Sequence, residues 1–285
     1  MSTIVIGLSI GMLLFLLAAG LTLIFGMLGI INFAHGALYM LGAYFAYQVA
    51  ASFGTFWLAL LISPLLLALV GAGIERLVLR PIYSRAHEFQ LLATFGLILV
   101  LEEFVRVVWG LQLRSIAPPP GLSGSINLFD TDISKYRLFV VFFGAVMVAL
   151  LFFGIERTKL GLILRASSDN AAMAAGLGID VNRVRTGIFA LGAALAGIGG
   201  TIAGPMLPIQ LQMGFTVILD CFIVVIIGGL GNIRGAVFGA LLIGMTRAFG
   251  QQYAAEWIDI ATYAVLVATL LLRPAGLFGI KVRTA

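Results

Sequence analysis

The chain has 285 residues, of which 61% are hydrophobic and only 10% are charged, and its mean hydropathy is +1.13. Soluble globular domains carry about 25% charged residues, so this composition excludes a water-soluble protein and indicates an integral membrane protein. The 17 Lys and Arg outnumber the 12 Asp and Glu, but they lie between hydrophobic runs and therefore report membrane orientation, not nucleic-acid binding.

Apolar runs of about 20 residues recur along the chain, which is the length that a helix needs to cross a bilayer. They predict an all-α polytopic helical bundle, because the strands of a membrane β-barrel would alternate apolar and polar residues. The expected spans are 4–25, 35–52, 55–74, 90–109, 137–155, 186–206, 216–230, 235–253 and 257–272. The seventh and eighth are short, so we expect eight or nine spans, some of them broken helices, in one transmembrane domain over residues 1–285. The first run lacks a preceding basic segment and a following cleavage site, so we expect it to be retained.

The basic residues predict the orientation of these spans. Three segments, 76–88, 156–185 and the tail after residue 272, hold 11 of the 17 Lys and Arg, and we place them in the cytoplasm. The 110–136 loop holds only Arg114 and Lys135 and is expected outside. Nine spans would then put the N-terminus outside and the C-terminus inside.

The segment 25–44, FGMLGIINFAHGALYMLGAY, interrupts an apolar run with small and polar residues. Small residues let membrane helices approach closely, and this explains most of the glycines, including those of AGIGGTIAG at 196–204. It explains Asn32 and His35 less well, because polar groups at membrane depth need partners or a water-lined cavity. We therefore predict that this first break, with Gly29, Asn32, His35 and Gly36, lines or gates a translocation pathway.

The fourth span carries several polar residues. Arg106 follows Glu102 and Glu103 at helical spacing, so we expect an ion pair on one helix. Thr94, in ATFGL, is a further candidate for the pathway.

The longest cytoplasmic connection, residues 156–185, is centred on a short alanine-rich helix. Ser168 or Asp169 is expected to cap its start, and Gly176 and Gly178 to end it. Isolated helices shorter than about 12–15 residues are marginal in water, so this one must dock on something. It is either a connector packed on its own bundle or a helix that fits a groove on a cytoplasmic partner.

A second break, GGLGNIRGAVFGA at 228–240, lies in the other half of the chain. Gly-interrupted apolar segments in both halves of a transporter point to a translocation site, because broken helices expose N-termini that attract a carboxylate. We assign Gly229, Gly231 and Asn232 to the same pathway. Nearby, Asp220 is expected to be hydrated at the outer end of its span. Arg247 is expected to face another subunit or an acidic partner, because an unpaired arginine in lipid is costly.

Several kinds of chemistry have no motif in this chain. There is no G-x-x-x-x-G-K-[ST] phosphate loop and no G-x-S-x-G elbow. Cys221 is the only cysteine, so an internal disulfide and a cysteine metal cluster are excluded. Two histidines without a cysteine or carboxylate cluster do not form an ordinary zinc site. We therefore expect no enzyme and no metal site.

The heptad NAAMAAG at 170–176 resembles the EAA-x-x-x-G loop by which ABC importer permeases engage their ATPases, with Asn170 where that motif has Glu. Further matching segments follow one another along the whole chain: 20–44, ERLVLRPIY at 75–83, ATFGL at 93–97, 226–244 and LLLRPAGLFG at 270–279. Together they resemble the permease of the branched-chain amino-acid ABC importers, the shorter of the two paired permeases. The residues assigned to ATPase coupling are Arg165, Asp169, Asn170, Ala171, Ala172, Gly176, Gly178 and Arg183.

The resemblance implies a multi-pass protein of the bacterial inner membrane, in contact with lipid and not with nucleic acid. The expected partners are a second homologous permease, two cytoplasmic ABC ATPases that bind the ATP and Mg, and a periplasmic substrate-binding protein. This chain itself would hold no cofactor. Its substrate would be Leu, Ile or Val, or else another amino acid, urea or a short amide.

Two other classes of function stay open. One is an ion-coupled secondary carrier that uses Glu102, Glu103 or Asp220, and the other is a passive channel. Neither of them explains a capped alanine helix held in a basic cytoplasmic loop.

Overall fold

The computed structural model describes residues 2–128 and 131–279, and each span expected from the sequence coincides with a helix in it. The helices of the bundle are α1 (Ser2–Leu28), α2 (Ala34–Phe53), α3 (Phe56–Ile74), α4 (His87–Trp109), α5 (Lys135–Leu151), α8 (Val181–Ala203), α9 (Met213–Gly228), α10 (Ile233–Tyr253) and α11 (Ile258–Leu272). Two shorter helices, α6 (Lys159–Asp169) and α7 (Ala171–Gly176), lie in the 156–185 connection.

Short irregular helices extend several of these elements. A π-helical segment, η1 (Glu75–Leu79), and a 3-10 turn, η2 (Arg80–Ile82), continue α3. A second π-helical segment, η3 (Phe152–Glu156), continues α5, and a 3-10 turn, η4 (Ala255–Trp257), precedes α11. The sequence had predicted helices alone, but the 110–136 loop also forms an antiparallel hairpin of β1 (Ser125–Leu128) and β2 (Thr131–Ser134).

Six segments of the described chain are long and apolar enough to cross a membrane: 2–28, 56–82, 135–155, 181–203, 233–253 and 255–272. The expected count of eight or nine spans is therefore not confirmed. Helix α9 has only 16 residues, so it is about 24 Å long, less than the hydrocarbon core. Glu88, Glu102, Glu103 and Arg106 make α4 more polar, although it is long enough.

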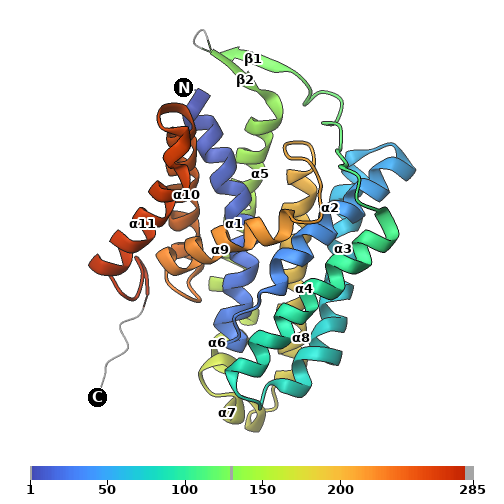
Figure 1. Cartoon of the computed structure of the whole chain (residues 1–285). Helices are drawn as coiled ribbons and strands as arrows, with labels where there is room; N and C mark the ends of the chain where they lie inside the picture. Colours follow the sequence, from blue (N-terminus) through green and yellow to red (C-terminus); the bar gives the residue numbers. More distant parts are fainter. Residues whose placement is uncertain (1, 129–130, 280–285) are drawn as a thin grey trace.

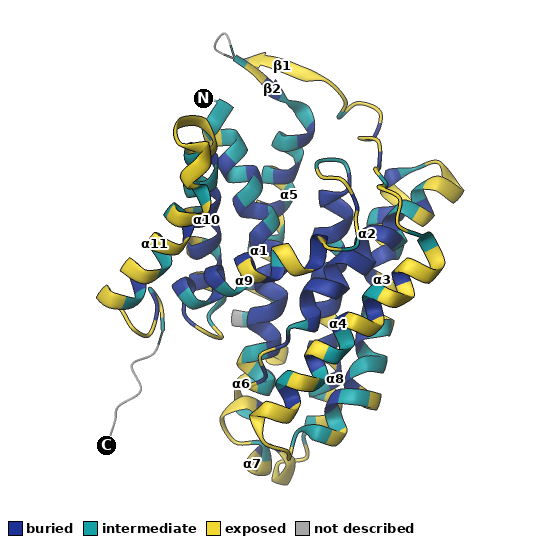
Figure 2. Cartoon of the chain, viewed as in Figure 1, coloured by how far each residue is buried: buried dark blue, intermediate teal, exposed yellow. Residues whose placement is uncertain are grey.

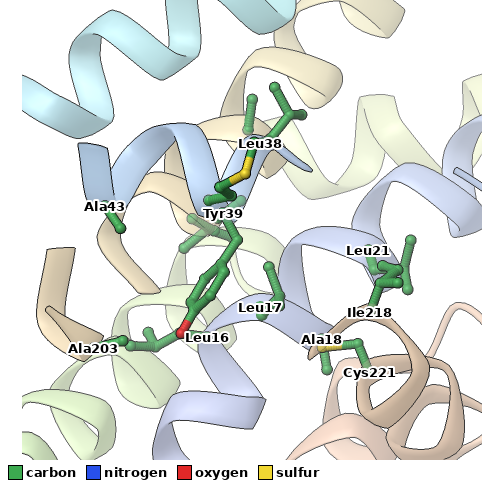
Figure 3. Close-up of a cluster of buried hydrophobic side chains, with 14 of the residues drawn as sticks. Leu16, Leu17, Ala18, Leu21, Leu38, Tyr39, Ala43, Ala203, Ile218 and Cys221 are labelled. Atoms are coloured by element: carbon green, nitrogen blue, oxygen red, sulfur yellow. The ribbon is translucent and has the colours of Figure 1, made fainter. Parts of the chain in front are cut away.

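Helices α1, α2 and α8 form the interior of the bundle, and α11 lies at its periphery (Figure 2). Figure 3 shows a part of the core where side chains of α1, α2, α8 and α9 meet, among them Leu17, Tyr39 and Ile218. The helices on the outside carry exposed large apolar residues, such as Leu69 of α3 and Val107 of α4. These residues provide the apolar surface that a membrane protein presents to lipid.

Glycines allow the interior helices to cross closely, as the sequence predicted for 196–204. A Cβ added at Gly42 of α2 would lie 2.6 Å from Gly197 Cα of α8, and one at Gly200 would lie 2.2 Å from Tyr39 O. Any side chain there would separate the helices. Without a hydrophobic driving force between helices in lipid, such close packing is a main source of their association.

The two ends of the bundle differ in charge. The N-terminus and the hairpin lie at one end, and α6 and α7 lie at the opposite end (Figure 1). Of the basic residues assigned to the cytoplasm, Arg76 and Arg80 belong to η1 and η2, Arg157 lies between η3 and α6, and Lys159 begins α6. Lys281 and Arg283 lie outside the described residues.

Candidate functional site

The first break returns the chain into the middle of the bundle. After α1 ends at Leu28, residues 29–33 turn back along it, and α2 begins beside the central part of α1. The His35 side chain marks this depth, because its Nε2 lies 3.0 Å from the carbonyl oxygen of Leu17. Gly20 faces the same imidazole, and a Cβ there would lie 2.9 Å from it. Helix α2 therefore starts as a half-helix inside the bundle.

Helix α9 begins at the same depth, against the start of α2 (Figure 1). A Cβ at Gly36 would lie 2.3 Å from Gly214 O, so the two backbones are in direct contact. Neither helix has a side-chain cap at its N-terminus. Two half-helix N-termini, each with backbone N–H groups that carry partial positive charge, thus meet inside the bundle.

Several buried polar atoms in and near the first break lack a hydrogen-bond partner among the described residues. The Asn32 side chain is fully buried, and neither its Oδ1 nor its Nδ2 has a hydrogen-bond partner among the described residues. The same holds for Nδ1 of His35 and for Oγ1 of Thr22, on α1. Buried polar groups are normally hydrogen-bonded, so these atoms are candidates for binding a ligand or water.

The second break is built differently. Gly229 and Gly231 adopt positive φ angles, +100° and +79°, in the turn between α9 and α10. Asn232 caps α10, since its Oδ1 accepts from Gly235 N at 3.2 Å, and its Nδ2 donates to Phe278 O at 2.9 Å. Its polar atoms therefore have partners in the chain itself.

A cavity of about 570 Å³ lies between the second break, α1, α6 and α8. Its apolar wall includes Leu23, Met27 and Ile188, and its polar wall includes Arg165 and Asp169 of α6. Gly231 and Asn232 line it, and so does Thr22. The cavity lies at the α6 end of the bundle, because Ser168 of α6 donates to Gly26 O at 2.6 Å.

The structure thus separates the residues that the sequence had grouped into one pathway. Asn32, His35 and Gly36 are packed inside the bundle, whereas Gly231 and Asn232 line the cavity at its α6 end. Gly29 is exposed in the first connector, with a φ of +65°. Thr94 is buried on α4 and donates to Leu91 O within its own helix.

The 156–185 connection presents a short helix at the end of the molecule. Helix α7 spans the predicted alanines and ends at Gly176, and Gly178 follows with a φ of +86°. The prediction that Ser168 or Asp169 caps this helix is wrong, because both belong to α6. Asn170 is the cap instead, and its side chain accepts from Met173 N at 2.9 Å.

One residue of α7 packs on its own chain, and the others are accessible. Ala174 is buried, whereas Met173 is 65% exposed and Leu177, directly after the helix, is 78% exposed. Ala172 and Gly176 are also exposed, and a Cβ at Gly176 would meet nothing within 4 Å. Exposed apolar side chains outside the membrane indicate a surface that a partner covers. Arg183 is exposed too and pairs with Asp180, the cap of α8.

Sequence reasoning missed a buried polar cluster that joins η1 and η2 to α8. The Glu75 side chain is fully buried; its Oε2 lies 2.8 Å from Arg80 Nη2 and accepts from Thr186 Oγ1 at 2.7 Å. Its Oε1 accepts from Tyr83 Oη at 3.1 Å, and burial followed by the Glu75 charge raises the pKa of this phenol, which stays a donor at neutral pH. The motif ERLVLRPIY contains three of these residues, but nothing in it identifies Thr186, 111 positions away from Glu75.

Two expectations about charged residues in the spans are corrected. Arg247 does not need an external acid, because its Nη2 lies 2.6 Å from Asp220 Oδ1 in the same chain. Asp220 is accordingly buried, and not hydrated as expected. The predicted pair on α4 is confirmed for Glu103, which lies 2.8 Å from Arg106 Nε on the helix surface.

Helices that begin inside the bundle, together with six long apolar segments, indicate a multi-pass membrane protein. The profile of the family described as "Branched-chain amino acid transport system / permease component" matches residues 3–270. The chain belongs to this family and is a multi-pass protein of the bacterial inner membrane.

Individual relatives agree with this assignment. The chain is 30% identical to the permease protein LivH of the high-affinity branched-chain amino acid transport system of Salmonella typhimurium, over 96% of this chain and 93% of LivH. It is 31% identical to BraD of Pseudomonas aeruginosa, over 96% and 94%. It is 23% identical to LivM of Escherichia coli, where 93% of this chain matches only 68% of LivM. Its length thus corresponds to the shorter permease type. No solved structure matches the chain.

Proposed function

We propose that this chain is the transmembrane subunit of an ATP-driven importer of branched-chain or other apolar amino acids. The observation that carries the proposal is the match to LivH and BraD over nearly the whole length of both chains. The chain would pair with a second, similar permease and receive substrate from a periplasmic binding protein. Two cytoplasmic ATPases would bind the ATP and Mg and hydrolyse the ATP, because this chain has no phosphate loop.

Helix α7 is the part of the chain that we propose contacts an ATPase. It is short, capped by its own Asn170, and exposes Met173 and Leu177 at the basic end of the bundle. An apolar helix of this kind fits a groove on a partner protein. The arginine-rich segments favour a cytoplasmic position for this end, where the ATPases would bind.

The translocation pathway, in this proposal, runs past the first break and opens to the cytoplasm at the cavity. The N-termini of α2 and α9 would attract the substrate carboxylate, and the unpartnered Asn32 side chain would hydrogen-bond to the amino acid or its water. In the cavity, Arg165 and Asp169 offer both charges that a zwitterion needs, beside an apolar wall. Helices α2, α4 and α9 would complete the membrane domain, for a total of eight or nine spans.

The ion-coupled carrier is less well supported. Such a carrier needs an acid whose proton or sodium affinity is coupled to the substrate site. Glu103 is paired with Arg106 on the helix surface, and Asp220 is paired with Arg247. These ion pairs favour a structural role for both acids.

A pull-down followed by reconstitution tests the proposal. The tagged chain is isolated from its native membranes, its partners are identified by mass spectrometry, and leucine uptake into proteoliposomes is measured with and without ATP. Bulky side chains at Ala172 and Gly176 (A172W with G176W) should remove the ATPases, since both positions are exposed and the bundle does not need them small. A tryptophan at Leu111, exposed at the opposite end, is the matched control.

The importer proposal would be overturned if the chain were recovered without ATPases. It would also be overturned if uptake depended neither on ATP nor on the substitutions A172W and G176W. Uptake that depends on ATP but favours urea or a short amide over leucine would keep the mechanism and replace the substrate.

A further inference from the structure

The Glu75 cluster connects the segment after α3 to the beginning of α8, the helix that follows α7 in the chain. Four contacts link the first two turns of α8 to residues 75–83. In one of them, Arg80 Nη2 donates to Thr186 Oγ1 at 2.5 Å. Thr186 donates to Glu75, Arg80 Nη2 donates to Asn182 O at 3.4 Å, and the Arg185 guanidinium lies 5.1 Å from the centre of the Tyr83 ring. The beginning of α8 is therefore attached to α3 by hydrogen bonds, charge and ring stacking together.

The segment that connects α7 to the beginning of α8, residues 177–180, is short, and Gly178 is the one glycine in it. Gly178, in the left-handed region, allows the chain to turn after α7, and Asp180 then caps α8 at once, with its Oδ1 3.1 Å from Arg183 N. Ala174 also packs α7 against its own chain. A displacement of α7 consequently reaches the first turns of α8 with little slack between them.

Separating α8 from Glu75 would be costly. The carboxylate has no exposed surface, and its partners on η2, in the turn after η2 and on α8 occupy both of its oxygens. A buried charge that loses its partners is strongly unfavourable, so α8 and η1 have to move together. Further along, α3 and α8 interlock, since a Cβ at Gly71 would lie 2.5 Å from Ala193 Cβ and one at Gly197 would lie 3.1 Å from Pro64 Cα.

The backbone at Glu75 is itself unusual. The π-helical segment Glu75–Leu79 directly follows the regular helix α3, and π-helical turns are frequent at functional sites. Here it places Glu75, Arg80 and Tyr83 on the side that faces α8.

We propose that Glu75, Arg80, Tyr83 and Thr186 form a coupling joint that carries the displacement of α7 to α3, and so to the transmembrane bundle. This inference rests on the proposed function, in which an ATPase moves α7. The four residues are positioning residues, because they act through the helices that they join and not by contact with substrate.

Two threonines of α8 provide a matched test. Thr186 Oγ1 lies 2.7 Å from Glu75 Oε2 and 3.0 Å from Asn182 O of its own helix. Thr201 is also buried, and among the described residues it donates only to Gly197 O of its own helix, at 2.8 Å. T186V and T201V remove the same atom from the same helix, and T186S keeps the hydroxyl. Each variant is reconstituted with the partner permease and the ATPases, and substrate uptake and ATP hydrolysis are measured on the same proteoliposomes.

We expect T186V to retain its partners and its ATP hydrolysis but to move about fivefold less substrate per ATP, the lower end of usual coupling strengths. T201V and T186S should match the wild type. If T186V moves as much substrate per ATP as T201V does, the inference is overturned. A parallel loss of assembly, ATP hydrolysis and uptake would also overturn it, because that result indicates a role in folding alone. Absence of ATP-driven uptake by the wild type would instead contradict the proposed function.

A distance measurement separates coupling from folding without any substrate. Spin labels are attached through cysteines introduced at Leu65 of α3 and Phe238 of α10, which are both exposed, in a protein that also carries Cys221→Ala. The distance between the labels is measured by double electron–electron resonance with and without a non-hydrolysable ATP analogue. In the assembled complex the analogue should change this distance, and T186V should reduce the change while T201V does not. An unchanged distance in the otherwise wild-type protein would overturn the inference.

Discussion

The two breaks look alike in sequence but differ in what their asparagines do. Each contains Asn followed within a few residues by Gly-Ala, and in both the glycine packs against an end of α9. Gly36 contacts Gly214 at its start, and Gly235 contacts Gly228 at its end. Asn232, however, satisfies its side chain by capping α10 and donating to Phe278 O, whereas the Asn32 side chain is buried without a partner among the described residues.

This difference shows how to distinguish a structural polar residue from a functional candidate inside a membrane. A residue whose side chain forms its hydrogen bonds with the surrounding backbone, as that of Asn232 does, contributes to the fold. A residue that is buried and keeps its hydrogen-bonding capacity unused, as Asn32 does, has an energetic cost that the fold does not explain.

The largest effects should come from the glycines that the two breaks share. A Cβ at Gly235 would lie 1.9 Å from Gly228 O, and one at Gly36 would lie 2.3 Å from Gly214 O. G235A and G36A should each lower the free energy of unfolding by about 3 kcal/mol, because backbone has to move. Thermal unfolding in detergent measures this. G96A, where a Cβ meets nothing within 4 Å, is the control. Normal stability of either variant would show that α9 is not held closely at that end.

Substitution of the two asparagines by leucine should affect stability differently in the two breaks. N232L removes the cap of α10 and should lower the free energy of unfolding by about 1 kcal/mol, the usual value of an N-cap. N32L buries no new polar group and breaks no side-chain hydrogen bond, so its stability should equal or exceed that of the wild type.

The same pair tests the pathway if leucine uptake is measured beside thermal unfolding. N32L should be stable and slow in transport, since the proposed polar contact is lost. A destabilised N32L would mean that Asn32 is structural, like Asn232, and the contrast between the breaks would then disappear.

Among the glycines of the first break, the smaller effect should be at Gly29, which differs from Gly36 in having empty space around it. Its φ of +65° is the only reason to require glycine there, because a Cβ would meet nothing within 4 Å. G29A should therefore cost about 1 kcal/mol of unfolding free energy, the strain of alanine in a left-handed conformation. G73A, in the ordinary helix of α3, should instead be neutral or stabilising. If G29A lowered the free energy of unfolding as much as G36A, the connector at residues 29–33 would have to be tightly packed.

Local patterns were sufficient for the helices of the bundle and for the exposed helix α7. Runs of apolar residues located each helix of the bundle, and the alanines followed by Gly176 and Gly178 located α7 and its end. The same patterns were not sufficient for the cap of α7. Ser168, Asp169 and Asn170 are adjacent and all able to cap, and only the end of α6 at Asp169 leaves Asn170 in that position.

Pairs of residues distant in the chain were outside the reach of such patterns. Arg247 and Asp220 are 27 positions apart, and Glu75 and Thr186 are 111 apart, so no spacing rule connects them. Asn32 and Asn232 have similar neighbours in sequence, and only the packing around them decides whether their amides are satisfied.

By itself the sequence determined the membrane environment, the helices and the position of α7, because these depend on composition, periodicity and local hydrogen bonding. The family followed from the resemblance of its motifs to known permeases. The tertiary structure alone decided that α2 and α9 meet as half-helices, that the two breaks lie in different surroundings, and that Glu75 joins α3 to α8. The physical reason is that burial and partner choice for a polar group are set by the other helices packed against it, and in a membrane protein those helices come from anywhere in the chain.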